Sequence, residues 1–134
     1  MATKRITFAN GAGNILAARL DMPDGPHLAT ALFAHCFTCT KSIKAAVNIA
    51  AALNREKIAV LRFDFTGLGQ SEGTFADTNF STNVADLILA SEYLAREFQP
   101  PQIIIGHSLG GAAVIQAAEK IPSLRAVVTI AAPH

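Results

Sequence analysis

The sequence has little charge of either sign and no long hydrophobic run. Charged residues make up 16% of the 134 residues, and the formal net charge is +1, so we expect no basic face that would hold nucleic acid or an anionic membrane. No apolar stretch approaches the roughly 18 residues that cross a bilayer. The first ten residues also lack the apolar core of a secretory signal. We therefore expect a cytoplasmic protein that has neither nucleic acid nor membrane as a partner.

Tryptophan is absent, tyrosine occurs once and cysteine occurs twice. The two cysteines, Cys36 and Cys39, form a single C-x-x-C stretch, and in a reducing compartment we expect thiols there rather than a structural disulfide. Hydrophobic residues nevertheless make up 51% of the chain. This share excludes a disordered protein and predicts one compact domain with a large core.

Apolar patterning predicts strands that alternate with helices after an opening hairpin. The expected strands cover residues 4–9, 15–22, 28–34, 58–65, 102–106 and 124–131, and the expected helices cover residues 41–57, 80–98 and 109–120. The run 28–34 is apolar apart from Thr30, as in a strand that is covered on both faces. This order predicts an α/β protein with a mostly parallel, doubly wound sheet and helices on both faces.

The stretch QIIIGHSLGGAA, residues 102–113, places a serine between glycines where a predicted strand meets a predicted helix. A serine in G-x-S-x-G at such a turn is typical of a nucleophile elbow. Side chains in place of Gly106 and Gly110 would collide with the turn and with neighbouring elements. We expect Ser108 to point outward as a nucleophile, with the Leu109 amide able to donate to an oxyanion. The alternative is a serine that only caps the following helix.

Three stretches, FAHCFTC, FDFTGLGQSEG and IIIGHSLGG, resemble the α/β-hydrolase superfamily in their order and spacing. They are most similar to the hydrolase half of bifunctional proteins that carry an OsmC-like domain downstream, and the resemblance covers the chain from Lys4 onward. It implies the following site: Ser108 as nucleophile, the amides of Leu109 and Phe37 as oxyanion donors, and Gly106, His107 and Gly110 as the elbow. Family members more often have glycine where this chain has Cys36.

The family order places an acid and then a histidine on strands that follow the nucleophile. Only residues 109–134 follow Ser108 here, enough for one helix and one strand. We therefore expect residues 1–134 to be the N-terminal part of the hydrolase domain, with its first six strands only and without the strands that carry the acid and the base. His134, which follows the sixth predicted strand, is expected near the pocket together with His35 and Cys36.

In its complete form the protein is expected to cleave a small acyl substrate, an ester, thioester or amide, through an acyl-enzyme. No cofactor and no metal are expected. Two alternatives stay open, a non-catalytic hydrolase-like scaffold or interaction module and a thiol redox protein that uses Cys36 and Cys39. The glycine-rich loop 66–73 does not match G-x-G-x-x-G, which argues against a dinucleotide site. Asp64 is expected to bond the backbone of its own loop rather than to supply the acid.

The sixth predicted strand, LRAVVTIA, is apolar on both faces and carries no lysine or proline. A strand of this kind at the edge of a sheet exposes a row of unpaired N–H and C=O groups that can recruit another chain. The sequence therefore predicts self-association through residues 124–131.

Overall fold

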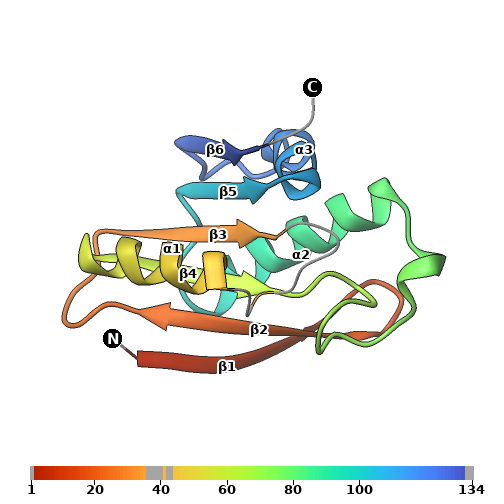
Figure 1. Ribbon diagram of the computed structural model, residues 1–134, viewed down its shortest axis with the longest axis horizontal. Coiled ribbons are helices and arrows are strands. Elements are labelled where there is room, and N and C mark those ends of the chain that lie inside the picture. The colour runs from red at the N-terminus through yellow and green to blue at the C-terminus, as the bar shows by residue number, and fades with distance from the viewer. Residues whose placement is uncertain (1, 36–40, 42–43, 132–134) are drawn as a thin grey trace.

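The computed structural model describes residues 2–35, 41 and 44–131, which form one six-stranded sheet and its helices (Figure 1). The strands are β1 (Ala2–Ala9), β2 (Ile15–Met22), β3 (Ala29–Ala34), β4 (Ile58–Phe63), β5 (Ile103–His107) and β6 (Ala126–Ile130). The helices are α1 (Lys44–Arg55), α2 (Phe80–Glu97) and α3 (Leu109–Ala118), with a short 3₁₀ turn η1 (Phe75–Asp77) before α2. No helix within these described ranges combines the length and the apolar character needed to span a bilayer.

The strands are arranged in the order β1-β2-β4-β3-β5-β6. The hairpin β1–β2 and the pair β2–β4 are antiparallel, whereas β3 pairs in parallel with β4 and β5, and β5 with β6. The predicted mostly parallel, doubly wound sheet is therefore confirmed. In the parallel register Ala34 of β3 lies beside Phe63 of β4 and Gly106 of β5, so the residues that follow these three strands meet at one edge.

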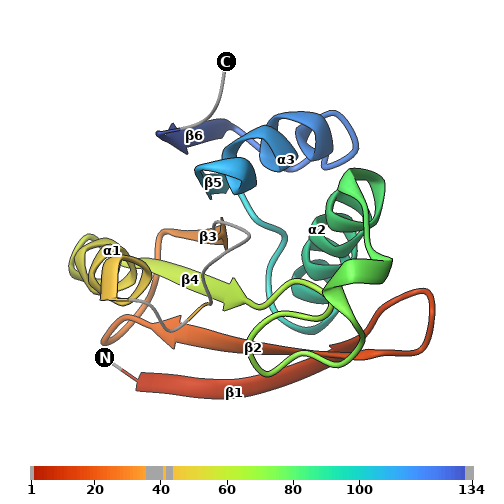
Figure 2. The same cartoon turned by 45° about the vertical axis from the view of Figure 1, so that its right-hand side comes forward.

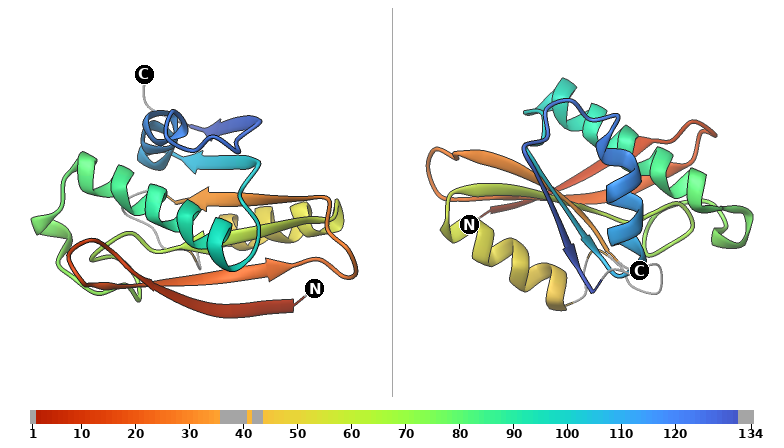
Figure 3. Two further views of the ribbon diagram at one scale, coloured as in Figure 1. Left: turned by 180° about the vertical axis from the view of Figure 1, so that it is seen from behind. Right: turned by 90° about the horizontal axis from the view of Figure 1, so that it is seen from above.

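Helices cover both faces of the sheet, as the turned views show (Figures 2 and 3). Alternate residues of β3 serve the two sides: Leu32 and Ala34 belong to the core beneath α2 and α3, whereas Ala31 and Phe33 belong to the core beneath α1. This alternation explains why β3 is apolar at every position except Thr30. The prediction of helices on both faces is confirmed.

Several predicted boundaries are wrong by a few residues. The first helix begins at Lys44 rather than at residue 41, because Lys41 is used in a buried polar contact. Leu28 is 79% exposed and precedes β3. β4 ends at Phe63, because Asp64 already turns into the loop that follows.

β6 occupies one edge of the sheet, and it is shorter than the predicted 124–131. All five of its residues are exposed, with Val127 at 44% and Val128 at 42%. These two neighbouring side chains point to opposite faces of a strand. Apolar surface is therefore exposed on both sides of this edge.

Candidate active site

Ser108 lies between the last residue of β5 and the first residue of α3, with φ of 57° and ψ of −123°. A positive φ is uncommon for a residue with a side chain and costs on the order of 1–3 kcal/mol. The Ser108 amide donates to the carbonyl oxygen of Ile130 at 2.8 Å, and the Gly111 amide donates to the Ser108 carbonyl oxygen at 2.9 Å. The Ser108 side chain makes no capping hydrogen bond to α3. This geometry does not match a helix-capping serine.

The two glycines that flank Ser108 are required by close packing of the backbone. A Cβ on Gly106 would lie 2.5 Å from the Gly110 carbonyl oxygen. A Cβ on Gly110 would lie 2.5 Å from the carbonyl oxygen of His35 and 2.6 Å from that of Ala34. The first turn of α3 thus packs directly on the end of β3, and the collisions expected from the sequence are found at both positions.

The other elbow residues surround this turn. Leu109 is the first residue of α3 and is 45% exposed. The first amides of a helix have no partner within the helix and lie at the positive end of its dipole, so they favour a negative charge nearby. His107 is half-buried at the end of β5, and within the described residues its buried Nδ1 has no hydrogen-bond partner.

Some of the predicted site residues fall outside the described residues. They are Phe37, Cys36, Cys39 and His134. The second oxyanion donor, Phe37, and two of the three residues expected near the pocket, Cys36 and His134, therefore stay predictions.

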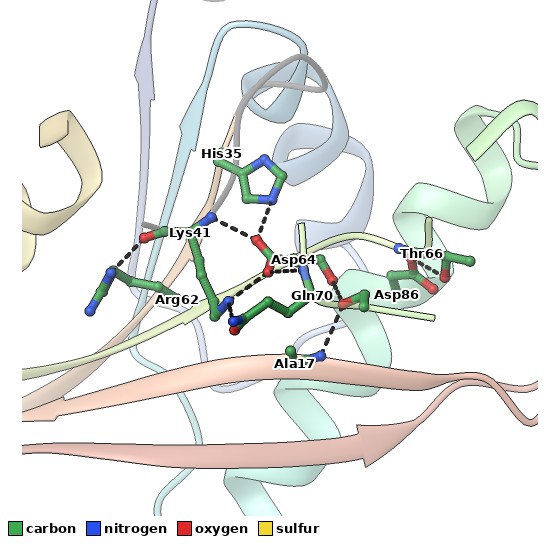
Figure 4. A network of polar contacts seen from close by, with 9 residues as sticks. Ala17, His35, Lys41, Arg62, Asp64, Thr66, Gln70 and Asp86 are labelled. Atoms are coloured by element: carbon green, nitrogen blue, oxygen red, sulfur yellow. Dashed lines mark hydrogen bonds and ion pairs between the residues drawn. The ribbon is translucent and has the colours of Figure 1, made fainter. Parts of the chain in front are cut away.

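His35 is buried at the end of β3 and faces Asp64 (Figure 4). Its Nε2 lies 3.6 Å from Asp64 Oδ1, and its ring meets the Phe65 ring edge-on, with 5.2 Å between the centroids. Asp64 directly follows β4 and His35 directly follows β3. The two residues meet because β3 and β4 are parallel neighbours.

Sequence reasoning missed Lys41, which is buried with 1% of its surface exposed. Its Nζ donates to Asp64 Oδ2 at 2.6 Å and to Gln70 Oε1 at 3.0 Å, and its backbone amide donates to Asp64 Oδ1 at 2.7 Å. The Gln70 amide donates to Asp64 Oδ2 at 3.0 Å, so Asp64 does bond its own loop, as expected. The buried ion pair with Lys41 was not expected.

A second buried ion pair lies beside the first. Arg62 donates from Nε to Asp21 Oδ2 at 2.6 Å and from Nη2 to Asp21 Oδ1 at 3.1 Å. The Thr3 hydroxyl also donates to Asp21, at 2.8 Å. Arg62 Nη1 donates to the carbonyl oxygen of Lys41 (Figure 4). The two pairs are therefore joined through the backbone of Lys41.

The glycine-rich loop after β4 is held by two buried carboxylates. Gly69 has a φ of 54°, and a side chain there would collide with the Asp64 carboxylate. Asp86 of α2 accepts from the backbone amide of Thr66 at 2.8 Å and from the Thr66 hydroxyl at 2.7 Å. Burial raises the pKa of Asp86 above its ordinary value of 3.8, although the two bonds from Thr66 act in the opposite direction.

Across residues 2–35, 41 and 44–131, no three or more His, Cys, Asp or Glu side chains come together in a group that could hold a metal ion. Asp64 and His35 approach each other, but the third group on Asp64 is a lysine ammonium. The polar centre of this part of the chain is therefore an ion-pair network.

The sheet order, the helices on both faces and the serine turn after β5 are those of the N-terminal half of an α/β-hydrolase fold. The chain belongs to the Hydrolase_4 family, described as serine aminopeptidase S33, whose sequence model matches residues 26–134. The hydrolase resemblance inferred from the three motifs is thus confirmed at the level of the family.

Two solved structures and one curated relative illustrate the similarity. The esterase domain of a Rhodothermus marinus protein is 51% identical with a TM-score of 0.82, over 99% of this chain and 51% of that chain. Est1E from Butyrivibrio proteoclasticus, solved with ferulic acid, is 28% identical with a TM-score of 0.81, over 91% of this chain and 50% of that chain. The mitochondrial palmitoyl-protein thioesterase ABHD10 of Mus musculus is 34% identical over 77 residues, which are 54% of this chain and 25% of that protein. The chain therefore spans about half the length of these structures and a quarter of the curated relative.

Proposed function

We propose that this chain is the nucleophile-bearing part of a serine hydrolase that cleaves an ester, thioester or amide through an acyl-enzyme. The observation that carries the proposal is the backbone of Ser108, which has a positive φ at a strand-to-helix turn between two glycines. A hydroxyl residue on such a strained turn is typical of a catalytic nucleophile.

In the proposed reaction the Ser108 hydroxyl attacks the carbonyl carbon of the substrate, and its proton passes to a general base. The tetrahedral intermediate carries a negative oxygen. Its collapse breaks the bond to the alcohol, thiol or amine, which leaves with a proton, and water then releases the acid from Ser108. By the family resemblance, the base and its partner acid belong to strands that follow the sixth one.

The amide of Leu109 is proposed as one donor to the negative oxygen, and the amide of Phe37 as the other. Leu109 supports this role because it opens α3 directly after the serine. The Phe37 assignment is supported by His35, two residues earlier, whose carbonyl oxygen packs against Gly110 in the first turn of α3. Each such donor contributes about 3–4 kcal/mol to stabilising the transition state.

The names of the relatives support an acyl substrate. They describe an esterase domain, an enzyme with bound ferulic acid, a palmitoyl-protein thioesterase and a serine aminopeptidase family. Esters, thioesters and peptides all carry a carbonyl carbon bonded to oxygen, sulfur or nitrogen, and ferulic acid is a carboxylic acid. All four names therefore fit a site for an acyl group. Residues 1–134 are proposed as the N-terminal part of one hydrolase domain. The OsmC-like fusion and the cytoplasmic location stay predictions.

Labelling with a fluorophosphonate tests the nucleophile. We expect the probe to modify Ser108 in the peptide 102–113, slowly because the proposed base lies on later strands, and we expect Ser108→Ala to abolish the modification. Cys36→Ala/Cys39→Ala is the matched control and should keep it. Labelling that persists in Ser108→Ala would contradict the proposal. A chain that reacts only with a thiol reagent, at Cys36 and Cys39, would instead favour the redox alternative.

We also propose that a second copy of the chain pairs with the edge of β6. The proposal is supported by the edge position of β6 and by the exposed Val127 and Val128 on its two sides. An edge strand without charge or proline has no feature that prevents such pairing.

A further inference from the structure

Asp64 contacts the residue that precedes the segment 36–40 and the residue that follows it (Figure 4). His35 precedes this segment and Lys41 follows it, and both residues reach the same carboxylate. In the sequence, Asp64 lies 23 residues after Lys41 and on a different strand end. A single buried carboxylate therefore contacts the residues at both ends of the segment.

On the first side, the contact leads to the serine turn. Asp64 Oδ1 lies 3.6 Å from His35 Nε2, and the Phe65 ring packs edge-on against the His35 ring. The backbone of the same histidine packs against α3, because its carbonyl oxygen would be 2.5 Å from a Cβ on Gly110. Asp64 and the elbow glycine Gly110 therefore contact the same residue, His35, one through its side chain and the other through its carbonyl oxygen.

On the second side, the hydrogen-bond partners of the carboxylate among the described residues are all donors. The Lys41 amide donates to Oδ1, while Lys41 Nζ and the Gln70 amide donate to Oδ2. Two acceptor oxygens suit this arrangement, and an amide side chain does not, since its NH₂ group would face at least one N–H donor. Lys41 is also held through its carbonyl oxygen by Arg62.

We infer that Asp64 is a positioning residue, which holds His35 against the serine turn and Lys41 at a fixed distance from it. This inference rests on the proposed function, because the segment between them includes Phe37, the second proposed oxyanion donor. The role of Asp64 is to fix the ends of that segment, and the carboxylate itself does not touch the substrate.

Amide hydrogen exchange tests the positioning without any need for catalysis. In Asp64→Asn we expect peptides that contain residues 35–41 to exchange at least about tenfold faster, whereas peptides from α2 and α3 keep the wild-type rate. Asp86→Asn is the matched control, because Asp86 is equally buried but, among the residues the structure describes, accepts only from Thr66, through one oxygen that asparagine retains. It should leave residues 35–41 at the wild-type rate.

Gln70→Ala provides a milder second variant if Asp64→Asn does not fold. It removes one acceptor of Lys41 Nζ and should accelerate exchange in the same peptides, by about threefold. Urea unfolding of each variant shows whether the protein is folded during the exchange. Acceleration that is spread evenly over the whole chain, or absent from residues 35–41, would overturn the positioning role.

The rate of fluorophosphonate labelling at Ser108 then tests whether the positioning by Asp64 affects the reactivity of the serine. We expect Asp64→Asn to slow the labelling by about tenfold or more, up to the roughly 10²- to 10³-fold that complete loss of an oxyanion donor costs, and Asp86→Asn to leave it unchanged. A wild-type rate in a folded Asp64→Asn variant would overturn the link to the oxyanion site. If Ser108 is not labelled in the wild type, the proposed function fails, and the exchange result alone decides whether Asp64 positions the segment.

Discussion

The amide of Ser108 donates to the carbonyl oxygen of Ile130 at 2.8 Å, so the turn that carries the proposed nucleophile is fastened to the last residue of β6. β6 is also the exposed edge of the sheet. The exposed edge strand and the serine turn are therefore joined directly by a backbone hydrogen bond. A substitution in β6 that disrupts the strand would therefore also disturb the position of Ser108.

We expect the wild-type chain to associate at micromolar concentration, and Val127→Lys/Val128→Lys to prevent it. Lysines on both sides of β6 would place charge against an incoming strand. Sedimentation velocity provides the measurement. Ile115→Lys is the control, because Ile115 is 58% exposed on α3 and is not part of the strand. A wild-type chain that sediments as a monomer would contradict the association.

The elbow glycine Gly110 should not tolerate alanine. The added Cβ would lie 2.5 Å from the His35 carbonyl oxygen, and backbone atoms cannot move aside as the end of a side chain can. We expect Gly110→Ala to lower the free energy of unfolding by about 1–3 kcal/mol in urea titrations. Gly11→Ala is the control, since nothing lies within 4 Å of its added Cβ, and it should change stability by less than about 0.5 kcal/mol. Equal effects of the two substitutions would argue against a tight elbow.

Breaking the buried ion pair should cost far more than breaking an exposed one. Lys41→Met leaves the Asp64 carboxylate buried without its cation, and we expect a loss of about 3–5 kcal/mol in the free energy of unfolding. Glu97→Gln breaks the exposed contact with Arg96 and should cost less than about 1 kcal/mol. Urea unfolding of both variants tests the comparison. A loss of under about 1 kcal/mol for Lys41→Met would mean that solvent reaches Asp64.

The raised pKa of Asp86 predicts a stability that depends on pH. The folded protein keeps a proton on Asp86 at pH values where the unfolded chain has released it. The stability contributed by this group is complete below the ordinary pKa of 3.8 and is lost as the pH rises through the raised pKa of the folded protein. Asp86→Asn does not titrate. Its stability relative to the wild type should therefore increase as the pH rises from about 4 to about 7. Urea unfolding at several pH values measures this difference, and a flat difference would show that the pKa of Asp86 is not raised.

The isolated chain should hydrolyse a p-nitrophenyl ester weakly. The Ser108 side chain makes no capping bond, and the described part of the chain shows no histidine hydrogen-bonded to it. Removing the base from a serine triad costs on the order of 10⁶ in kcat. Any residual rate should fall in Ser108→Ala. A fast rate that depends on Ser108 would mean that a base such as His134 reaches the serine in this chain.

The fold and the serine turn could be predicted because their signals are local. The apolar run of β3 and the glycines around Ser108 each lie within a few consecutive residues, and packing on both faces of the sheet explains them. The network around Asp64 could not be predicted in the same way. Lys41 looked like part of a helix, and only the parallel pairing of β3 with β4 brings it and His35 to the same carboxylate. The order of the strands was needed before that pairing could be known.

The contact between Gly110 and the end of β3 is made by main-chain atoms on both sides. Side chains can be exchanged during evolution or by an engineer, but the main chain is common to every sequence with this fold. The separation between β3 and α3 is therefore independent of how the core around it is composed. In the proposed enzyme, substrate preference would change through the surrounding side chains, while the distance from the serine turn to the strand that leads into the proposed oxyanion segment stays the same.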